Sequence, residues 1–276
     1  MFTLFITKKK IIAYRSNVLK PLFPDLTLKE LLNLNVAEFT KNIHEKIPIG
    51  YDYYPNKKYD PVKTASYRNN KLYLTRLKTQ NMPAELYIST MPTTVETQEE
   101  LFDFITNNSE DQKRLILNLR AKNGFKRETN YLNNKKVHII NQMKHPTIDL
   151  KYKVLEYNNK EIDYLHFPWP EEEMPKVEDV VFLIKLLDQT LSASDYPRIL
   201  IHCKAGLNRS GSVVLSYLLY KKVKAELALN KKPEEIRLNP AQVLSELRMK
   251  RPRLLKEPRF FELALKSLQE LLRTSK

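Results

Sequence analysis

RILIHCKAGLNRSG, residues 198–211, contains the only cysteine of the chain, Cys203. Its opening part, Arg198–His202, has the apolar centre of a buried strand. A short loop of mostly small residues follows, and a helical pattern runs from Ser210 to Lys222. In an open α/β sheet, a loop that leads from a strand into a helix lies at the carboxyl edge, where ligands bind. The order of these elements therefore predicts an α/β fold with Cys203 at the end of a central strand.

The spacing within this stretch predicts a phosphate-binding loop that carries a nucleophile. Five residues separate Cys203 from Arg209. A loop of this length can turn its backbone N–H groups inward, and together with the N-terminus of the next helix they form a cradle for an anion. Gly206 permits the turn. The positive field of the cradle lowers the pKa of the Cys203 thiol, which makes it a thiolate nucleophile at neutral pH.

Arg209 and Ser210 supply two further functions that phosphoryl transfer to a cysteine requires. The Arg209 guanidinium is a planar fork that binds two phosphoryl oxygens, and it binds them more strongly as charge develops in the transition state. The Ser210 hydroxyl can donate to the sulfur when the cysteine leaves. The competing interpretation is that Cys203 only packs, as many free cysteines do. Because the four required residue types at these offsets arise by chance with a frequency of about one in 10⁴ to 10⁵, we favour catalysis.

The pattern His202, Cys203, five residues, Arg209, Ser210 resembles the signature of the cysteine-dependent protein tyrosine and dual-specificity phosphatases. The resemblance implies a single α/β domain in which a central mixed sheet is flanked by helices. It implies that Cys203 is the nucleophile and that no metal or other cofactor takes part. The further residues implied at the site are His202, Arg209 and Ser210 for catalysis, and Lys204, Ala205, Gly206, Leu207 and Asn208 for substrate binding.

The segment WPEEEMP, residues 169–175, resembles the mobile Trp-Pro-Asp loop that supplies the general acid in this family. It contains the only tryptophan of the chain, Trp169, and Glu171 lies 32 positions before Cys203. The resemblance implies that Glu171 protonates the leaving group, although the family normally has aspartate at this place. A glutamate can donate the same proton, but its additional methylene displaces the carboxyl group and can slow the transfer.

A solvated acidic loop is the competing interpretation of this segment. Acidic residues are favoured near the N-terminus of a helix, and a helical pattern begins at Val177. We accept this interpretation for Glu172 and Glu173, and we favour catalysis for Glu171. Asp163 is the second candidate for the acid, although it lies inside a strand pattern.

Three weaker matches extend the resemblance along the chain. NKKY, residues 56–59, resembles the loop whose tyrosine walls the phosphotyrosine pocket, which implies substrate binding by Tyr59; an exposed surface tyrosine is an equal alternative. Tyr87–Val95 resembles a strand that contains Tyr-Ile-Ala-Thr-Gln-Gly-Pro. Arg248–Phe261 parallels the Arg-x-x-Arg segment before the last helix, but Lys256 stands near the place of the glutamine that positions the hydrolytic water.

Strand and helix patterns alternate along the chain, which predicts a sheet that helices cover on both faces. Residues 1–50 are predicted to form a helical extension, with Thr27 as a helix cap, that packs on a catalytic domain of residues 51–276. The segment Lys221–Lys232 is predicted to be an exposed insertion. The predicted strands are Leu86–Met91, Arg114–Leu119, Val137–Ile140, Lys151–Glu156, Ile162–Phe167 and Arg198–His202; the predicted helices are Thr97–Ile105, Val177–Thr190, Ser210–Lys222, Pro240–Lys250 and Pro258–Leu272.

The composition excludes several classes of protein. With 276 residues, of which 42% are hydrophobic, the chain can form one large domain with a core. One cysteine and five separate histidines exclude an internal disulfide and a cysteine-rich zinc module, which favours a reducing compartment and metal-free chemistry. No stretch approaches the roughly 18 consecutive apolar residues of a membrane span. We expect a soluble, monomeric, cytoplasmic protein without an export signal; delivery into a host cell as an effector is the alternative.

The charge favours anionic partners. The chain has 47 lysines and arginines against 32 acidic residues, a net charge of +15. Such a chain attracts phosphorylated proteins, anionic lipid or nucleic acid, although a solvated lysine-rich surface is the simpler interpretation of charge alone.

The loop around Tyr59 and the strand around Tyr87 favour a phosphorylated protein as substrate, hydrolysed at phosphotyrosine and also at phosphoserine or phosphothreonine. Lys204 keeps phosphoinositide hydrolysis open, and the pair Asn208 and Arg209 resembles the RNA 5′-triphosphatases of this superfamily, which keeps RNA 5′-phosphate hydrolysis open. Glu171 and the missing glutamine keep open a phosphate-binding pseudophosphatase.

Overall fold

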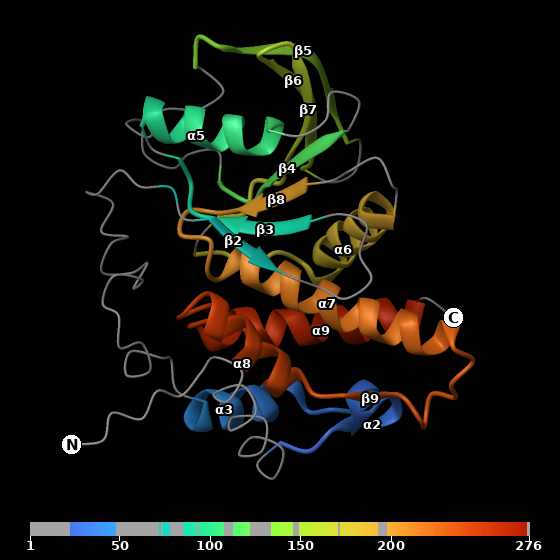
Figure 1. Ribbon diagram of the computed structural model, residues 1–276. Coiled ribbons are helices and arrows are strands. Elements are labelled where there is room, and N and C mark those ends of the chain that lie inside the picture. The colour runs from blue at the N-terminus through green and yellow to red at the C-terminus, as the bar shows by residue number, and fades with distance from the viewer. Residues whose placement is uncertain are drawn as a thin grey trace, which may run out of the picture.

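A mixed sheet of seven strands forms the centre of the described part of the protein (Figure 1). The computed structural model describes residues 23–47, 72, 74–77, 85–92, 94–107, 113–121, 134–145, 149–170, 172–192 and 198–274. The strand order is β2-β3-β8-β4-β7-β6-β5, with the four strands from β3 to β7 parallel and the outer three antiparallel to their neighbours. The strands are β2 (Leu74–Leu77), β3 (Glu85–Ser89), β4 (Arg114–Asn118), β5 (Val137–Lys144), β6 (Lys151–Tyr157), β7 (Lys160–His166) and β8 (Arg198–His202).

Helices cover both faces of this sheet (Figure 1). The helices are α2 (Leu28–Leu32), α3 (Val36–Lys46), α5 (Val95–Thr106), α6 (Val177–Ser192), α7 (Arg209–Ala228), α8 (Pro240–Lys250) and α9 (Pro258–Thr274). Along β8, Ile199 and Ile201 pack with α6, α7 and α9, whereas Leu200, which lies between them, packs with α5 on the opposite face. The prediction of an α/β domain with a central mixed sheet flanked by helices is confirmed.

The N-terminal segment of residues 23–47 packs against the C-terminal helix. Leu31 and Ile43 are fully buried in the same hydrophobic cluster as Leu268 of α9. The Gln269 side chain donates to the Leu31 carbonyl at 2.8 Å, and β1 (Leu26–Thr27) pairs antiparallel with β9 (Arg237–Leu238). These contacts join the first described residues to the last ones through one continuous core.

Local capping explains where the N-terminal helices begin. Thr27 is the predicted cap, and its side chain accepts from the Glu30 backbone N–H while the Glu30 carboxylate accepts from the Thr27 N–H. The helix ends at Leu32, and a second helix begins after Asn35, whose side chain accepts from the Glu38 N–H. The leucine pattern after Thr27 therefore belongs to two short helices.

One predicted segment is wrong. Lys221–Lys232 is not wholly an insertion, because α7 continues to Ala228. Val223 on this last part of the helix is fully buried, and Lys224 forms an ion pair of 2.6 Å with Asp188 of α6. The buried Val223 and the ion pairs of Lys221 and Lys224 with Asp188 thus hold this last part of the helix, most of whose other residues are exposed. None of the helices in the described ranges is long and apolar enough to cross a lipid bilayer.

Candidate active site

Cys203 directly follows β8, the strand between β3 and β4 in the parallel part of the sheet. Backbone hydrogen bonds hold this strand end on both sides. The Leu119 N–H, after β4, donates to the His202 carbonyl at 2.8 Å, and the Met91 N–H, after β3, donates to the Lys204 carbonyl at 3.1 Å. The loop that starts at Cys203 therefore lies at the carboxyl edge of the central strands, where the sequence predicts it.

Gly206 makes a turn in this loop that no other residue fits. Its φ is +63°, a left-handed conformation that side chains disfavour. A Cβ atom at this position would lie 2.2 Å from the Ser89 carbonyl oxygen and 2.7 Å from Nη2 of Arg251. The close approach of β3 and the Arg251 side chain thus requires glycine.

Arg251 lies outside this loop but holds its backbone in place. The sequence motifs predicted no role for Arg251. Its buried guanidinium donates from Nε to the Gly206 carbonyl at 2.6 Å and from Nη2 to the Ala205 carbonyl at 2.8 Å. Burial lowers the pKa of Arg251 to about 10, so the group stays protonated at neutral pH. Because Arg251 binds the loop carbonyls from outside, loop N–H groups are left to face the sulfur of Cys203. The Arg-x-x-Arg spacing was the only available signal for this contact.

The thiol of Cys203 is buried and activated. Burial alone raises its pKa, but Arg209, the Ser210 hydroxyl and the backbone N–H groups of Ser210 and Leu207 act in the opposite direction. These four interactions outweigh burial, and the pKa lies below the ordinary cysteine value. The Ser210 hydroxyl is itself buried and, apart from this sulfur, has no hydrogen-bond partner in the described part of the chain. The arrangement stabilises a thiolate and leaves the hydroxyl directed to it.

His202 lies at the end of β8 and is fully buried. Burial is the main cause that lowers its pKa to about 3, with smaller contributions in the same direction from nearby His166, Arg120 and Arg209, against a hydrogen bond with the Cys203 carbonyl. That ring nitrogen, Nδ1, lies 3.3 Å from the carbonyl oxygen. The imidazole is therefore neutral at physiological pH, and its contribution is to the backbone position of Cys203.

The loop that begins at Trp169 lies against the phosphate loop, the segment of residues 203–209 that the sequence predicts to bind phosphate. Nη1 of Arg209 donates to the Trp169 carbonyl at 2.8 Å, and the indole Nε1 of Trp169 donates to the Glu173 carbonyl at 3.0 Å. Glu171, the predicted acid, lies outside the described residues. Glu172 and Glu173 are exposed, as the solvated-loop interpretation expects.

The sheet register removes Asp163 as an alternative acid. Asp163 of β7 pairs with Leu115, and Leu115 pairs with Ile199, four residues before Cys203 on β8. At about 3.3 Å per residue, this places Asp163 roughly 13 Å from the level of the nucleophile along the strands. Its carboxylate accepts a hydrogen bond of 2.6 Å from the Tyr152 hydroxyl. Asp163 thus joins two neighbouring strands and does not face the loop.

The remaining predicted residues fall into two groups. Lys204, Ala205 and Asn208 are half-buried, and Leu207 is buried; all four lie in the loop between β8 and α7. Tyr59 lies outside the described residues.

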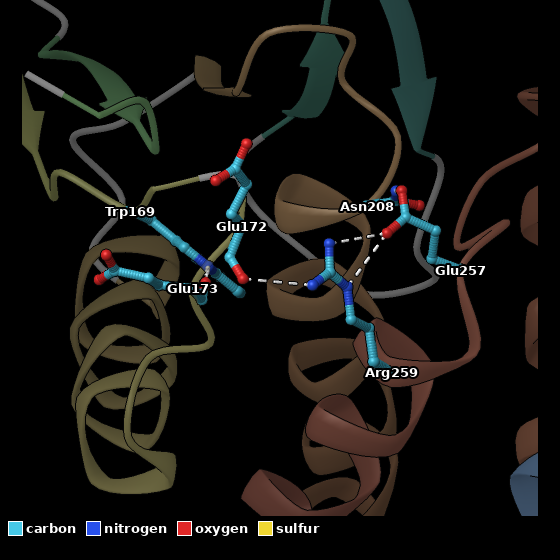
Figure 2. Close-up of polar contacts among 6 residues, drawn as sticks. All are labelled: Trp169, Glu172, Glu173, Asn208, Glu257 and Arg259. Atoms are coloured by element: carbon cyan, nitrogen blue, oxygen red, sulfur yellow. Dashed lines mark hydrogen bonds and ion pairs between the residues drawn. The ribbon is translucent and has the colours of Figure 1, made fainter. Parts of the chain in front are cut away.

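Two residues that the sequence did not suggest lie beside this loop, and Figure 2 shows them. The Asn208 side chain donates to the Glu257 carboxylate, which in turn binds Arg259. Both residues lie in the Arg248–Phe261 segment, just before and at the start of α9, but the resemblance of that segment implies no role for either of them.

The part of the sequence from residue 88 to residue 270 matches the family model described as Protein-tyrosine phosphatase. The matched part covers well over half of the chain and includes the parallel strands β4, β7 and β8, the end of β3, the loop of Cys203 and the segment that contributes Arg251. No curated protein matches the sequence. A buried thiol with a lowered pKa and a guanidinium beside it, at the carboxyl edge of a parallel sheet, agrees with the family match, and the chain belongs to the protein-tyrosine phosphatase family.

Proposed function

We propose that this chain is a cysteine-dependent phosphatase that hydrolyses phosphotyrosine in proteins, and phosphoserine or phosphothreonine as well, through a phosphocysteine on Cys203. The lowered pKa of the buried Cys203 thiol, beside Arg209 and the loop N–H groups, is the observation that carries the proposal. A buried thiol without these groups would have a raised pKa and would be a poor nucleophile.

The first step transfers the phosphoryl group to sulfur. The Cys203 thiolate attacks phosphorus, the S–P bond forms, and the P–O bond to the tyrosine breaks. Glu171 gives its proton to the departing phenolate oxygen, while Arg209 and the N–H groups of residues 204–208 bind the non-bridging oxygens. His202 holds the backbone at Cys203 in place.

The second step returns the enzyme to its starting state. A water molecule attacks phosphorus and gives a proton to the Glu171 carboxylate. The S–P bond breaks, inorganic phosphate is released and the thiolate is regenerated. The Ser210 hydroxyl, whose only partner within the described ranges is the sulfur, stabilises this leaving thiolate.

A small aryl phosphate tests the proposal directly. We expect the full chain to hydrolyse it and Cys203→Ser to lose activity by more than about 10³-fold, because an alcohol at this place is not ionised. Activity of Cys203→Ser within about tenfold of the parent would refute nucleophilic catalysis. Binding of phosphate by the parent without turnover would assign the chain to the pseudophosphatases instead.

Substrate preference needs three assays in parallel. Tyr59 and the half-buried Lys204 are the proposed contacts outside the inner loop. With phosphotyrosine peptide, phosphatidylinositol phosphate and triphosphate-ended RNA at equal concentrations, we expect the highest kcat/KM on the peptide. A preference for the lipid or the RNA would move the chain to the corresponding class within the superfamily.

A further inference from the structure

The loop after Trp169 is held at two points, on either side of Glu171. Arg209 donates to the Trp169 carbonyl at 2.8 Å from inside the phosphate loop. Arg259, the second residue of α9, donates from Nη1 to the Glu172 carbonyl at 3.3 Å from the opposite side. Both acceptors are backbone carbonyls, so these two hydrogen bonds act on the backbone of the loop.

Arg259 is in turn fixed by Glu257. Its Nε lies 3.1 Å and its Nη2 2.9 Å from Oε2 of the Glu257 carboxylate. The other carboxylate oxygen accepts from the side-chain amide of Asn208, the last residue before Arg209. Figure 2 shows the resulting path from Asn208 through Glu257 and Arg259 to Glu172. A side chain of the phosphate loop is thereby connected to the backbone beside Glu171.

Aromatic contacts orient the same guanidinium. It lies over the Phe260 ring, 4.9 Å from the ring centroid, and the Phe260 ring lies 5.8 Å from the Trp169 ring. A planar guanidinium that is held by a carboxylate, a ring and a carbonyl has few other orientations available. The geometry therefore differs from that of an isolated surface ion pair, which would leave Arg259 free to move.

We propose that Arg259 is a positioning residue for the acid loop and that Glu257 ties this position to the phosphate loop. The proposal rests on the proposed function, in which Glu171 protonates the leaving group. Proton transfer requires the carboxyl group within hydrogen-bond reach of the leaving oxygen, and a displacement of about 1 Å can cost about 10²-fold in rate. The contacts at Trp169 and Glu172 hold the described backbone before and after position 171.

Leaving groups distinguish positioning from general damage. In the full chain, Arg259→Ala should lower kcat on phenyl phosphate, a poor leaving group, by about 10- to 100-fold. On nitrophenyl phosphate, whose leaving group needs little protonation, the loss should stay below about threefold. Equal losses on the two substrates, or no loss on either, would overturn the proposal.

Two control variants match this substitution. Lys266→Ala breaks an ion pair of 2.7 Å with Glu262 on the same helix, and its side chain is 50% exposed against 44% for Arg259. Glu172→Ala removes a side chain but keeps the carbonyl that Arg259 binds. Both controls should retain the activity of the parent on both substrates; a loss in Glu172→Ala equal to that in Arg259→Ala would show that the backbone contact is not what matters.

A double variant separates positioning from charge. Arg259→Ala leaves the Glu257 carboxylate without its cation beside the phosphate loop, which should raise KM for an anionic substrate. Glu257→Gln combined with Arg259→Ala removes this charge. We expect KM to return toward the parent value while the kcat loss on phenyl phosphate persists. Recovery of kcat in the double variant would show that the kcat loss in Arg259→Ala comes from the unpaired charge of Glu257. It would refute the positioning role of Arg259.

Trp169 provides a measurement that needs no turnover. It is the only tryptophan and is 1% exposed, so its fluorescence reports on this loop alone. Arg259→Ala should increase quenching by acrylamide by at least about twofold, with thermal unfolding showing that the variant is folded. Unchanged quenching would contradict a positioning role for Arg259, even if the parent chain had no phosphatase activity. An inactive parent with increased quenching in the variant would refute the proposed function and retain the structural role of Arg259.

Discussion

The reactivity of Cys203 depends on neighbours that oppose the effect of its burial. Arg209 is the largest of these influences, and the Ser210 hydroxyl is the next. Removing Arg209 leaves burial to raise the pKa of the thiol. We expect alkylation by iodoacetamide to reach half its maximum rate at a higher pH in Arg209→Ala and Ser210→Ala than in the parent. Because the chain has one cysteine, no other thiol contributes to this measurement; an unchanged midpoint in both variants would contradict the expected activation.

His202 should make the protein sensitive to acid. Its pKa is about 3 in the folded state, so the unfolded chain binds a proton at higher pH than the native protein does. Stability contributed by the neutral ring is complete above about pH 6.5 and falls by about 2 kcal/mol by pH 5. Urea unfolding between pH 7 and pH 5 should show a smaller loss in His202→Gln than in the parent. Parallel curves for the two proteins would rule out this origin.

Glu171 and Glu172 can be separated by the same leaving-group comparison. If Glu171 is the acid, Glu171→Gln should lose about 10²- to 10⁴-fold on a poor leaving group and much less on nitrophenyl phosphate. Glu171→Asp should keep activity, because a shorter carboxyl group occupies this place in the family. Glu172 contributes its carbonyl to Arg259, so Glu172→Gln should behave like the parent. Equal small effects at the two positions would remove Glu171 from the mechanism.

The sequence alone predicted those site residues that lie close to one another along the chain. Cys203, Arg209 and Ser210 act within one loop, so their spacing alone predicted their proximity. Arg251 and Arg259 reach the site from separate segments, and only packing brings them to the loop carbonyl of Gly206 and to the carbonyl of Glu172. The Arg-x-x-Arg spacing was the one local signal for Arg251, and no local pattern distinguishes Arg259 from the arginines on the surface.

Among the structural elements, the loop between β8 and α7 contains Gly206 and the first turn of α7 contains Gly211, and the two glycines have different steric requirements. An added Cβ at Gly206 would meet backbone at 2.2 Å, whereas at Gly211, inside α7, it would meet only leucine side chains at 3.0 Å or more. Gly206→Ala should therefore destabilise the fold by about 2 kcal/mol or more and abolish turnover. Gly211→Ala should change stability by no more than about 1 kcal/mol, since helix propensity offsets the tighter contact. Urea unfolding and turnover of nitrophenyl phosphate check both, and similar effects at the two positions would contradict the close contact at Gly206.

Elements buried on both faces were the most predictable. Arg198–His202 has the predicted bounds because a run of buried apolar residues marks a central parallel strand. The strand Leu74–Leu77 was missed, since it is short, lies at the edge of the sheet and is only partly buried. The strand Val137–Lys144 extends beyond its predicted end at Ile140 because pairing with β6, and not burial, defines its second half.

At the scale of the whole molecule, the N-terminal segment shares the core with the rest of the protein. Leu31 is fully buried against α9, although its sequence position lies before every strand of the large sheet. Leu31→Ala should lower the free energy of unfolding by about 2 to 5 kcal/mol, as in an ordinary core. Exposed Leu229→Ala, a leucine that is 69% exposed, should cost less than about 0.5 kcal/mol. A negligible effect at Leu31 in urea unfolding would show that the segment detaches without cost.

The hydrogen bonds from Arg251 to the Ala205 and Gly206 carbonyls can form only after the C-terminal part of the chain has been synthesised. Cys203 is synthesised 48 residues before Arg251, and until then the Ala205 and Gly206 carbonyls have no guanidinium to hold them. We therefore expect a nascent chain that ends before Arg251 to lack the folded phosphate cradle. A translation product truncated at that point should hydrolyse no phosphoester.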